Sequence, residues 1–450
     1  MGAPGREGQQ SGLRRTDPLG CAISHPQRAL LWVIAAQFFS TLADNALLFV
    51  AISLLVQRQS AAWMVPALRV VFYVSFVVLA VFAGAVADVM PKGRVILATN
   101  LVKLGGCFLL LAQVHPLAAY AIVGFGAAAY SPAKYGILPE LLPPSKLVGA
   151  NAVMEVMTVV AILLGVVLGS FLIETGGPLA HTALPPADAA ICLLAVLYVA
   201  ACACSLSIRR MAASNPAAFA HPGQLLRTFR RSCRLLWGDA EGQISLAVTS
   251  LFWAASAVLQ FVVLRWAQQS LHLSLAQAAL LQTAGALGMV AGAAAAARFI
   301  PLAHALRTLP LGLAVGLAIL AMNSVLQLWI AIGVLLAVGM ASGLLLVPLN
   351  ALLQHRGQAL MHPGQSIAVQ CFSENVASLL MLAVYGALLV FDVTLRRGIL
   401  GFGLFVMGAV VLILLKYFTN NRRLPGTLPV MAVDERPAAW HADGRARGGP

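Results

Sequence analysis

The sequence contains few charged residues. Only 10% of its 450 residues are Asp, Glu, Lys or Arg, whereas 60% are hydrophobic, and the mean hydropathy is +0.88. Soluble domains carry about 25% charged residues, so this shortage excludes a soluble globular protein of such length. We therefore expect an all-α polytopic membrane protein.

Several motifs of enzymes and metal proteins are also missing. The seven cysteines include no C-x-x-C pair, so neither a disulfide framework nor a zinc site is expected. No Lys follows a Gly, which argues against a P-loop and hence against an intrinsic ATPase. None of the nine histidines is followed by Asp five positions later, so the H-x-x-x-x-D acyltransferase signature is absent. We expect neither an enzyme nor a bound cofactor or metal.

The net charge of +14 reflects where the basic residues lie. They occupy short gaps between apolar runs, so we do not expect nucleic-acid binding. Alternate gaps are rich in Lys and Arg, whereas the gap at 174–186 has none. Cytoplasmic loops carry this excess of positive charge, which places both termini in the cytoplasm.

A helix needs about 20 mainly apolar residues to cross a bilayer. The first apolar run is too long for the core of a cleaved signal peptide, so it is expected to remain as a span. Twelve spans are predicted, at 29–57, 64–87, 95–112, 116–138, 149–173, 187–206, 244–266, 273–297, 308–325, 328–353, 364–391 and 398–418.

The longest internal gap falls between the sixth and seventh predicted spans and divides them into two six-helix halves. The expected organisation is a disordered cytoplasmic tail at 1–28, a six-helix bundle at 29–206, a cytoplasmic basic linker at 207–243, a second six-helix bundle at 244–418 and a disordered cytoplasmic tail at 419–450.

The two halves carry a similar pattern around a glutamate. Pro132 is followed by Asn151 and Glu155, while Pro348 is followed by Gln370 and Glu374. In both cases an amide side chain lies four positions before the acid. Parallel repeats in transporters place matching features at equivalent spans, so this pattern favours duplication and a shared central pathway.

The most informative residues are acids in predicted spans. An Asp at the centre of a membrane helix costs about 2.5–3.5 kcal/mol, so such a residue is usually functional. Gln37, Thr41 and Asp44 share one face of a helix, with Asn45 on its flank. We expect Asp44 to face a cavity, whereas Asn45 fits a substrate contact and an interhelical hydrogen bond equally well. Glu155 and Glu374 could instead each form a structural ion pair with a neighbouring cation.

Three cations accompany these acids. Lys103 fits either a buried role or a side chain that reaches the interface. Lys134 follows Pro132, which should kink its helix and free a carbonyl, so we favour binding there. Arg265 lies near the outer end of its span, where anchoring is the simpler role. A site with both charge signs suits a zwitterion, such as a phosphate beside an ammonium.

Between the second and third spans, the stretch Gly84-Ala-Val-Ala-Asp88-Val-Met-Pro-Lys-Gly-Arg94 resembles the G-x-x-x-D…G-[RK] loop of the major facilitator superfamily, although Asp88 lies farther from the turn glycine than is usual. In that superfamily the acid and the basic turn are thought to hold helices together. The resemblance implies the twelve-helix fold of this superfamily.

Three further stretches resemble the bacterial lysophospholipid transporter family: residues 36–49 (AQFFSTLADNALLF), 126–138 (GAAAYSPAKYGIL) and 347–354 (VPLNALLQ). The resemblance runs from about Leu31 to Lys416. It implies a flippase-like facilitator that moves lysophospholipids, especially lysophosphatidylethanolamine, across the bacterial inner membrane. An acyltransferase/acyl-acyl carrier protein synthetase would re-acylate them there.

The resemblance extends to the candidate site. The family's polar membrane residues match Asp44, Asn45, Lys134, Glu155 and Glu374, and Glu374 is followed by Asn375, as in the family. One departure is that the family has an arginine where this chain has Gln260, whereas Arg265 lies five residues later. The candidate substrate-binding residues are therefore Asp44, Asn45, Lys103, Lys134, Glu155, Arg265, Glu374 and Asn375.

Two questions stay open from the sequence. A proton-coupled exporter of amphipathic drugs or metabolites would use Asp44 or Glu155 as its proton carrier. If the substrate is a lysophospholipid, its acyl chain could stay in the bilayer and enter through a lateral gap between helices, which would remove the need for a large apolar cavity.

Overall fold

The chain folds as an assembly of long helices. A computed structural model describes residues 25–61, 63–175, 185–208, 213, 215 and 222–423, and this part of the chain contains helices and no strand. The long helices are α1 (His25–Gln57), α2 (Met64–Val89), α3 (Lys92–Leu111), α4 (Pro116–Gly136), α6 (Pro144–Thr175), α7 (Pro186–Leu206), α9 (Ala240–Ser270), α10 (Leu275–Phe299), α12 (Leu328–Leu360), α13 (Pro363–Val390) and α14 (Leu395–Arg423).

Every predicted span corresponds to helical structure. Eleven described segments are long and apolar enough to cross a membrane. The predicted span at 116–138 forms α4, which falls outside that set because Tyr, Ser, Pro and Lys near its end lower the hydropathy. The ninth span consists of three pieces, η3 (Leu302–Thr308), α11 (Leu311–Ala321) and η4 (Met322–Ser324).

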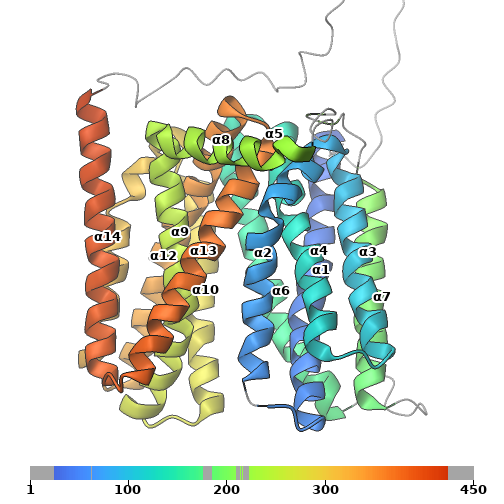
Figure 1. The fold of residues 1–450 in the computed structure, drawn as a ribbon. Helices are drawn as coiled ribbons and strands as arrows, with labels where there is room; N and C mark the ends of the chain where they lie inside the picture. The colour runs from blue at the N-terminus through green and yellow to red at the C-terminus, as the bar shows by residue number, and fades with distance from the viewer. Residues whose placement is uncertain are drawn as a thin grey trace, which may run out of the picture.

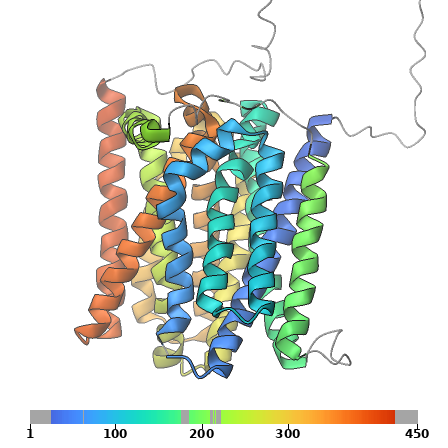
Figure 2. The same cartoon turned by 45° about the vertical axis from the view of Figure 1, so that its right-hand side comes forward.

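The helices form two groups that stand side by side (Figure 1). Helices α1–α7, which include the short α5 (Leu138–Leu141), make one half and α9–α14 the other. The described chain begins and finishes at the same end of the bundle, seen at the top of Figures 1 and 2. We call this the terminal end, and the opposite end the far end. Each half has its own apolar core, and a third cluster of buried residues joins the halves.

The predicted linker contains the helix α8 (Leu225–Gly238), which lies across the terminal end (Figure 1). Its apolar residues recur every three or four positions, so one side of the helix can pack on the bundle. Leu225, Phe229 and Leu236 are buried, and the Phe229 ring meets the Phe372 ring of α13 edge-on at 5.5 Å. The arginines of α8 are exposed on the opposite side.

Hydrogen bonds join the halves at the terminal end. The Asp88 carboxylate, at the end of α2, accepts from the backbone N–H groups of Gly364 (2.8 Å) and Gln365 (3.0 Å) in the first turn of α13. A helix N-terminus carries partial positive charge, so a carboxylate there is stabilising. Lys92 lies 3.8 Å from Asp88 and pairs with Glu140. These contacts agree with the helix-holding role expected of the loop at 84–94.

The boundaries of the expected tails shift slightly. Helix α1 begins at His25 and α14 continues to Arg423, so each helix extends into the range expected for a tail. The rest of both expected tails, at 1–24 and 424–450, lies outside the described residues.

Candidate functional site

A cavity of about 300 Å³ lies between the two halves. Side chains of α1, α2, α3, α4, α6, α9 and α13 line it. Five of them are ionisable at neutral pH in water: Asp44, Arg69, Lys103, Lys134 and Glu374. The cavity therefore brings together charges of both signs from both halves of the molecule.

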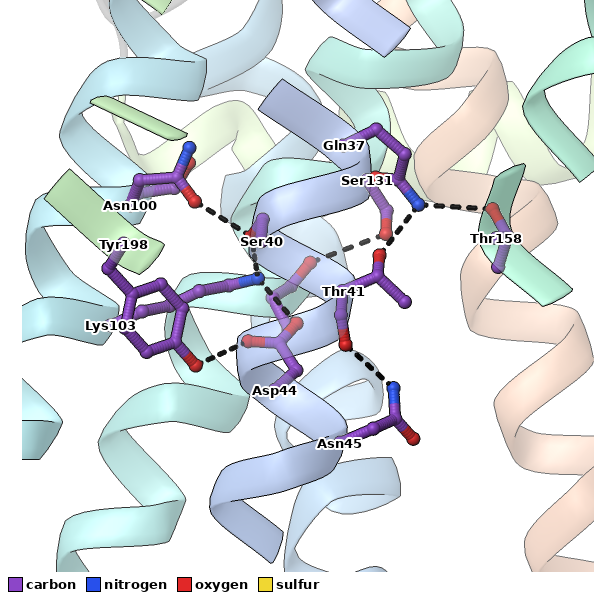
Figure 3. Close-up of polar contacts among 12 residues, drawn as sticks. Gln37, Ser40, Thr41, Asp44, Asn45, Asn100, Lys103, Ser131, Thr158 and Tyr198 are labelled. Atoms are coloured by element: carbon purple, nitrogen blue, oxygen red, sulfur yellow. Dashed lines mark hydrogen bonds and ion pairs between the residues drawn. The ribbon is translucent and has the colours of Figure 1, made fainter. Parts of the chain in front are cut away.

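Asp44 is the centre of a hydrogen-bond network in the first half (Figure 3). Lys103 Nζ donates to Asp44 Oδ2 at 2.7 Å and to Ser40 Oγ at 2.9 Å, and Tyr198 Oη donates to Asp44 Oδ1 at 2.7 Å. Ser40 in turn donates to Asn100 Oδ1 at 2.8 Å. The charge of Asp44 is thus compensated inside the protein, and this offsets the desolvation cost of burying it.

Lys103 is a buried partner and does not reach the membrane interface. Only 1% of the residue is exposed, and its ammonium lies 4.9 Å from the centre of the Tyr130 ring. The structure therefore decides between the two roles that its depth in α3 allowed. Asp44 keeps 14% of its side chain exposed and borders the cavity, as expected from its position on α1.

The face of α1 predicted from the sequence is present. Gln37 Nε2 donates to Thr41 Oγ1 at 2.8 Å and to Thr158 Oγ1 on α6 at 3.1 Å. Asn45 lines the cavity as well, and its amide nitrogen donates to the Thr41 carbonyl at 2.9 Å (Figure 3). The Asn45 side chain is therefore fixed by its own helix and makes no hydrogen bond to another helix within the described chain.

Lys134 occupies the cavity wall without a carboxylate at salt-bridge distance among the described residues. Its ammonium lies 4.1 Å from the Tyr135 ring centre and 5.9 Å from that of Tyr130. Aromatic faces attract cations, so the rings hold the ammonium in place without neutralising it. Pro132 lies inside α4, two residues earlier, as expected. Lys134 is therefore available to an anionic ligand.

Glu374 and Asn375 form the opposite wall on α13. Gln370 Nε2 bridges Glu374 Oε1 (2.8 Å) and Asn350 Oδ1 on α12 (2.9 Å). Asn375 donates to the Cys371 carbonyl at 2.7 Å. One oxygen of Glu374 is thus positioned by an amide, and no cation lies within salt-bridge distance of it in the described chain.

Two predicted residues differ from this arrangement. Glu155 is 4% exposed and is absent from the residues that line the cavity, although Lys134 lies within electrostatic range of it. Arg265 lies in a separate apolar groove formed by α9, α13 and α14. The polar cavity thus contains six of the eight predicted residues. Sequence spacing located the spans correctly but did not show which side of each helix faces the other half.

Arg69 also lines the cavity, although it is not among the predicted site residues. It lies five residues inside α2 from Met64, near the far end, and is exposed. Its position within the predicted span at 64–87 was the available signal, since an intramembrane charge is a functional candidate by default. Tyr73 and Trp253 also line the cavity, but aromatic residues are so common in spans that no sequence pattern distinguished them.

The arrangement can bind a ligand with both charge signs. Lys134 and Arg69 supply positive charge from the first half, and Glu374 supplies negative charge from the second. Ammonium and guanidinium groups donate to phosphate, and carboxylates accept from ammonium groups. Within the described residues, no group of three or more His, Cys, Asp or Glu side chains is arranged to hold a metal ion.

Comparison with known proteins identifies the family. The model of the Major Facilitator Superfamily matches residues 33–380. Two proteins called lysophospholipid transporter LplT, from Serratia proteamaculans and Yersinia pestis, are each 41% identical to the chain over 359 residues; these cover 80% of this chain and 88% and 86% of the relatives.

Solved structures share the fold at lower sequence identity. The human organic anion transporter MFSD10 superposes with a TM-score of 0.67 at 18% identity, over 88% of this chain and 100% of that one. A bacterial homologue of the iron transporter ferroportin superposes with a TM-score of 0.63 at 14% identity, again over 88% and 100%. The chain therefore belongs to the Major Facilitator Superfamily and, within it, to the family of lysophospholipid transporters.

Proposed function

We propose that this protein transports lysophospholipids, especially lysophosphatidylethanolamine, across the bacterial inner membrane, with both termini in the cytoplasm. The observation that carries the proposal is the cavity between the halves, which presents unpaired charge of both signs within a chain of this family. Lysophosphatidylethanolamine is a zwitterion with a phosphate and an ammonium group, so its headgroup complements such a cavity.

The charged residues support one orientation of the headgroup. The phosphate would contact Lys134, with Arg69 as a second contact nearer the far end, because neither has a carboxylate at salt-bridge distance in the described chain. The ammonium would contact Glu374. Asp44 is already bound by Lys103 and Tyr198, so it positions the wall that the headgroup passes.

The acyl chain would lie outside the cavity. Ligand pockets that enclose most of a drug-sized molecule have volumes of about 300–1,000 Å³, so a cavity of 300 Å³ suits a headgroup alone. An acyl chain that passes through a gap between the halves and stays in contact with membrane lipid would not need to leave an apolar environment. This supports lateral access of the lysophospholipid from the bilayer. Continued uptake after covalent closure of the gaps between the halves would contradict it.

The synthetase that would re-acylate the transported lipid belongs to the same proposal. Lysophospholipid delivered to the cytoplasmic leaflet needs a fatty acyl group before it becomes a bilayer phospholipid. An acyltransferase/acyl-acyl carrier protein synthetase supplies that chemistry in the family that this chain resembles.

The direct test is uptake of labelled lysophosphatidylethanolamine into spheroplasts that lack their own transporter. Wild type should import the lipid, and Lys134→Gln should reduce the initial rate at low substrate at least tenfold, because a charged hydrogen bond is worth about 1.5–3 kcal/mol. Lys146→Gln is the matched control, since this exposed lysine lies outside the cavity. Absence of uptake by wild type at normal membrane abundance would refute the substrate assignment.

The same assay separates the proton-coupled alternative. A facilitator should import the lipid equally well after the proton gradient is collapsed. The alternative gains some support from Glu155, a buried acid without a hydrogen-bond partner or ion pair given by the described chain. Loss of uptake on collapse of the gradient, together with insensitivity of the Glu155→Gln variant to that gradient, would establish proton coupling.

A further inference from the structure

A second, larger hollow lies on the outer surface of the second half. It has a volume of about 580 Å³ and is a groove between α9, α13 and α14. Its walls are almost entirely apolar, with Val258 and Val262 from α9, Met381 and Val384 from α13, and Phe402 and Phe405 from α14. This groove is separate from the polar cavity.

The groove opens towards the surrounding membrane. Leu380, Val384 and Phe405 line it and remain 63%, 54% and 51% exposed, so its mouth is not covered by described residues. Along α9 it extends from Leu251 to Arg265, which is about 21 Å at 1.5 Å per residue. The hydrocarbon core of a bilayer is about 30 Å thick, so each leaflet contributes about 15 Å and the groove is longer than one leaflet is thick.

Polar groups lie at the far end of the groove. Arg265 and Thr394 line it near the turn that joins α13 to α14. The Arg265 side chain forms no hydrogen bond or ion pair with another described residue, and Asp392, in the turn between α13 and α14, is not within salt-bridge distance of it. The Tyr385 hydroxyl is buried at the groove and also lacks a hydrogen-bond partner in the described chain.

This distribution matches the shape and polarity of a membrane lipid. The charged end lies where the helices turn at the membrane surface, and the apolar channel runs inward from it. The local charge is positive, because Arg396 and Arg397 lie next to this turn with Arg265 near it, and Asp392 is the acid of the turn. Unpaired polar groups next to an apolar channel need a partner that supplies both a phosphate and an acyl chain.

We propose that the groove binds one anionic bilayer phospholipid from the leaflet at the far end. One acyl chain lies along α9, α13 and α14, and the phosphate contacts the Arg265 guanidinium, with the Tyr385 hydroxyl as an additional donor. Lipid already present in the leaflet is the occupant because the groove opens sideways to the bilayer.

The site is distinct from the transport cavity. Helix α13 separates them, since Glu374 and Ser378 line the cavity while Ala377 and Met381 line the groove. Binding of a lipid in the groove is therefore independent of substrate transport through the polar cavity. A bound lipid would fill the space between α13 and α14 and stabilise the second half.

Two glycines on α14 allow the groove to be filled by mutation. Gly398 and Gly401 line it, and a Cβ atom at either position would meet nothing within 4 Å. Gly398→Leu should therefore extend into the channel from α14, with open space around its Cβ atom. Gly408→Leu is the matched control, because Gly408 lies on the same helix, is equally free of neighbours and does not line the groove.

The experiment is native mass spectrometry of the full chain in detergent, titrated with phosphatidylglycerol, phosphatidylethanolamine or lysophosphatidylethanolamine. Wild type should retain one phosphatidylglycerol in preference to the other lipids. Arg265→Gln should weaken that binding about fivefold, the factor expected for one juxtamembrane arginine, and should weaken phosphatidylethanolamine binding by less, because that lipid has no net charge. Gly398→Leu should abolish the tight site. Gly408→Leu should behave like wild type, and so should Arg58→Gln, which removes an exposed arginine directly after α1 and outside the groove.

Each other outcome contradicts the proposal in a defined way. Equal binding of all three lipids by wild type and Arg265→Gln would mean that the groove holds lipid without selecting a headgroup. Preferred binding of lysophosphatidylethanolamine would make it a second substrate site. Unchanged binding in Gly398→Leu, with a thermal unfolding temperature like that of wild type, would show that the lipid binds elsewhere.

Discussion

Asp44 illustrates how neighbours set the role of one side chain. A lone carboxylate inside a membrane protein is costly, and the one arginine of α1, Arg28, lies 16 residues before Asp44 along the helix, about 24 Å at 1.5 Å per residue. Lys103 from α3 and Tyr198 from α7 both donate to it, so three helices share the burial of one charge. Asp44 is therefore as much a connection between helices as a part of the cavity wall.

The pair of Asp44 and Lys103 should be strongly coupled in stability. Lys103→Met leaves the carboxylate without its cation and should destabilise the protein by about 3 kcal/mol, the low end for breaking a buried pair because Asp44 borders the cavity. The double variant Asp44→Asn/Lys103→Met should recover much of this loss. Thermal unfolding in detergent measures both. A double variant that loses as much as the sum of the single variants would show that the two residues act independently.

At the scale of elements, the first turn of α13 connects the halves. Its N–H groups donate to Asp88, and its Gln365 side chain accepts from Ser232 of α8 at 2.8 Å. The helices approach closely here: a Cβ atom on Gly364 would lie 2.6 Å from Asp88 Oδ1, and one on Gly84 would lie 2.8 Å from the Ala368 side chain. Glycine at both positions allows this approach.

Asp88→Asn should loosen the terminal end. The amide keeps the size of the carboxylate but loses its charge, which is worth up to about 2 kcal/mol at a helix N-terminus. A cysteine introduced at Ala368, which is 1% exposed behind the contact, should then react faster with a water-soluble maleimide than in the parent carrying Asp88. Asp188→Asn, at the start of α7, is the control. Equal labelling rates in all three proteins would rule out a role for the charge.

A second contact at the terminal end should depend on pH. Burial raises the pKa of Asp239, but hydrogen bonds from Arg356 and the Gly242 N–H together outweigh it and hold the pKa below the ordinary value of 3.8. A lowered pKa means that the charge stabilises the fold above pH 3.8 and that this stability disappears as pH falls through the folded-state pKa.

Asp239→Asn isolates that charge, because asparagine caps the N-terminus of α9 as well as aspartate does. The variant should be about 2 kcal/mol less stable than wild type at pH 7, and the difference should shrink steadily as the pH falls below 3.8. Thermal unfolding between pH 2.5 and 7 measures the effect. A difference that stays the same across this range would point to lost packing as its cause.

At the scale of the whole molecule, hydrogen bonds between the halves lie at the terminal end. Besides the Asp88 contact, Asn151 on α6 and Gln354 on α12 exchange two amide hydrogen bonds of 2.9 and 2.8 Å. Transport by alternating access requires these contacts to separate while the cavity stays between the halves.

Linking Asn151→Cys to Gln354→Cys with a reducible bifunctional reagent should therefore stop uptake, and reduction should restore it. The matched control is a pair within one half, Arg58→Cys and Gln113→Cys, whose native side chains are joined by a hydrogen bond of 2.8 Å. That link should leave uptake intact. Full transport with the halves linked would exclude separation at the terminal end.

How far the sequence determines the site differs from residue to residue. The face of α1 that carries Gln37, Thr41 and Asp44 follows from helical periodicity, so it could be predicted and is confirmed. Lys103 and Arg265 could not be resolved in this way, since depth in a span does not say which neighbour a side chain meets. The first became a buried partner of Asp44, and the second lies in a lipid-facing groove.

The sequence by itself determined the membrane-spanning fold, the positions of the spans and the family, because hydropathy and short motifs are local properties. It also placed most of the cavity's polar residues on the right helices. Only the tertiary structure decided which charges are compensated, that Glu155 lies behind the cavity wall, that Arg69 enters it, and that an apolar groove runs beside Arg265. Those outcomes depend on how helices distant in the chain rotate and pack against one another, which no local pattern encodes.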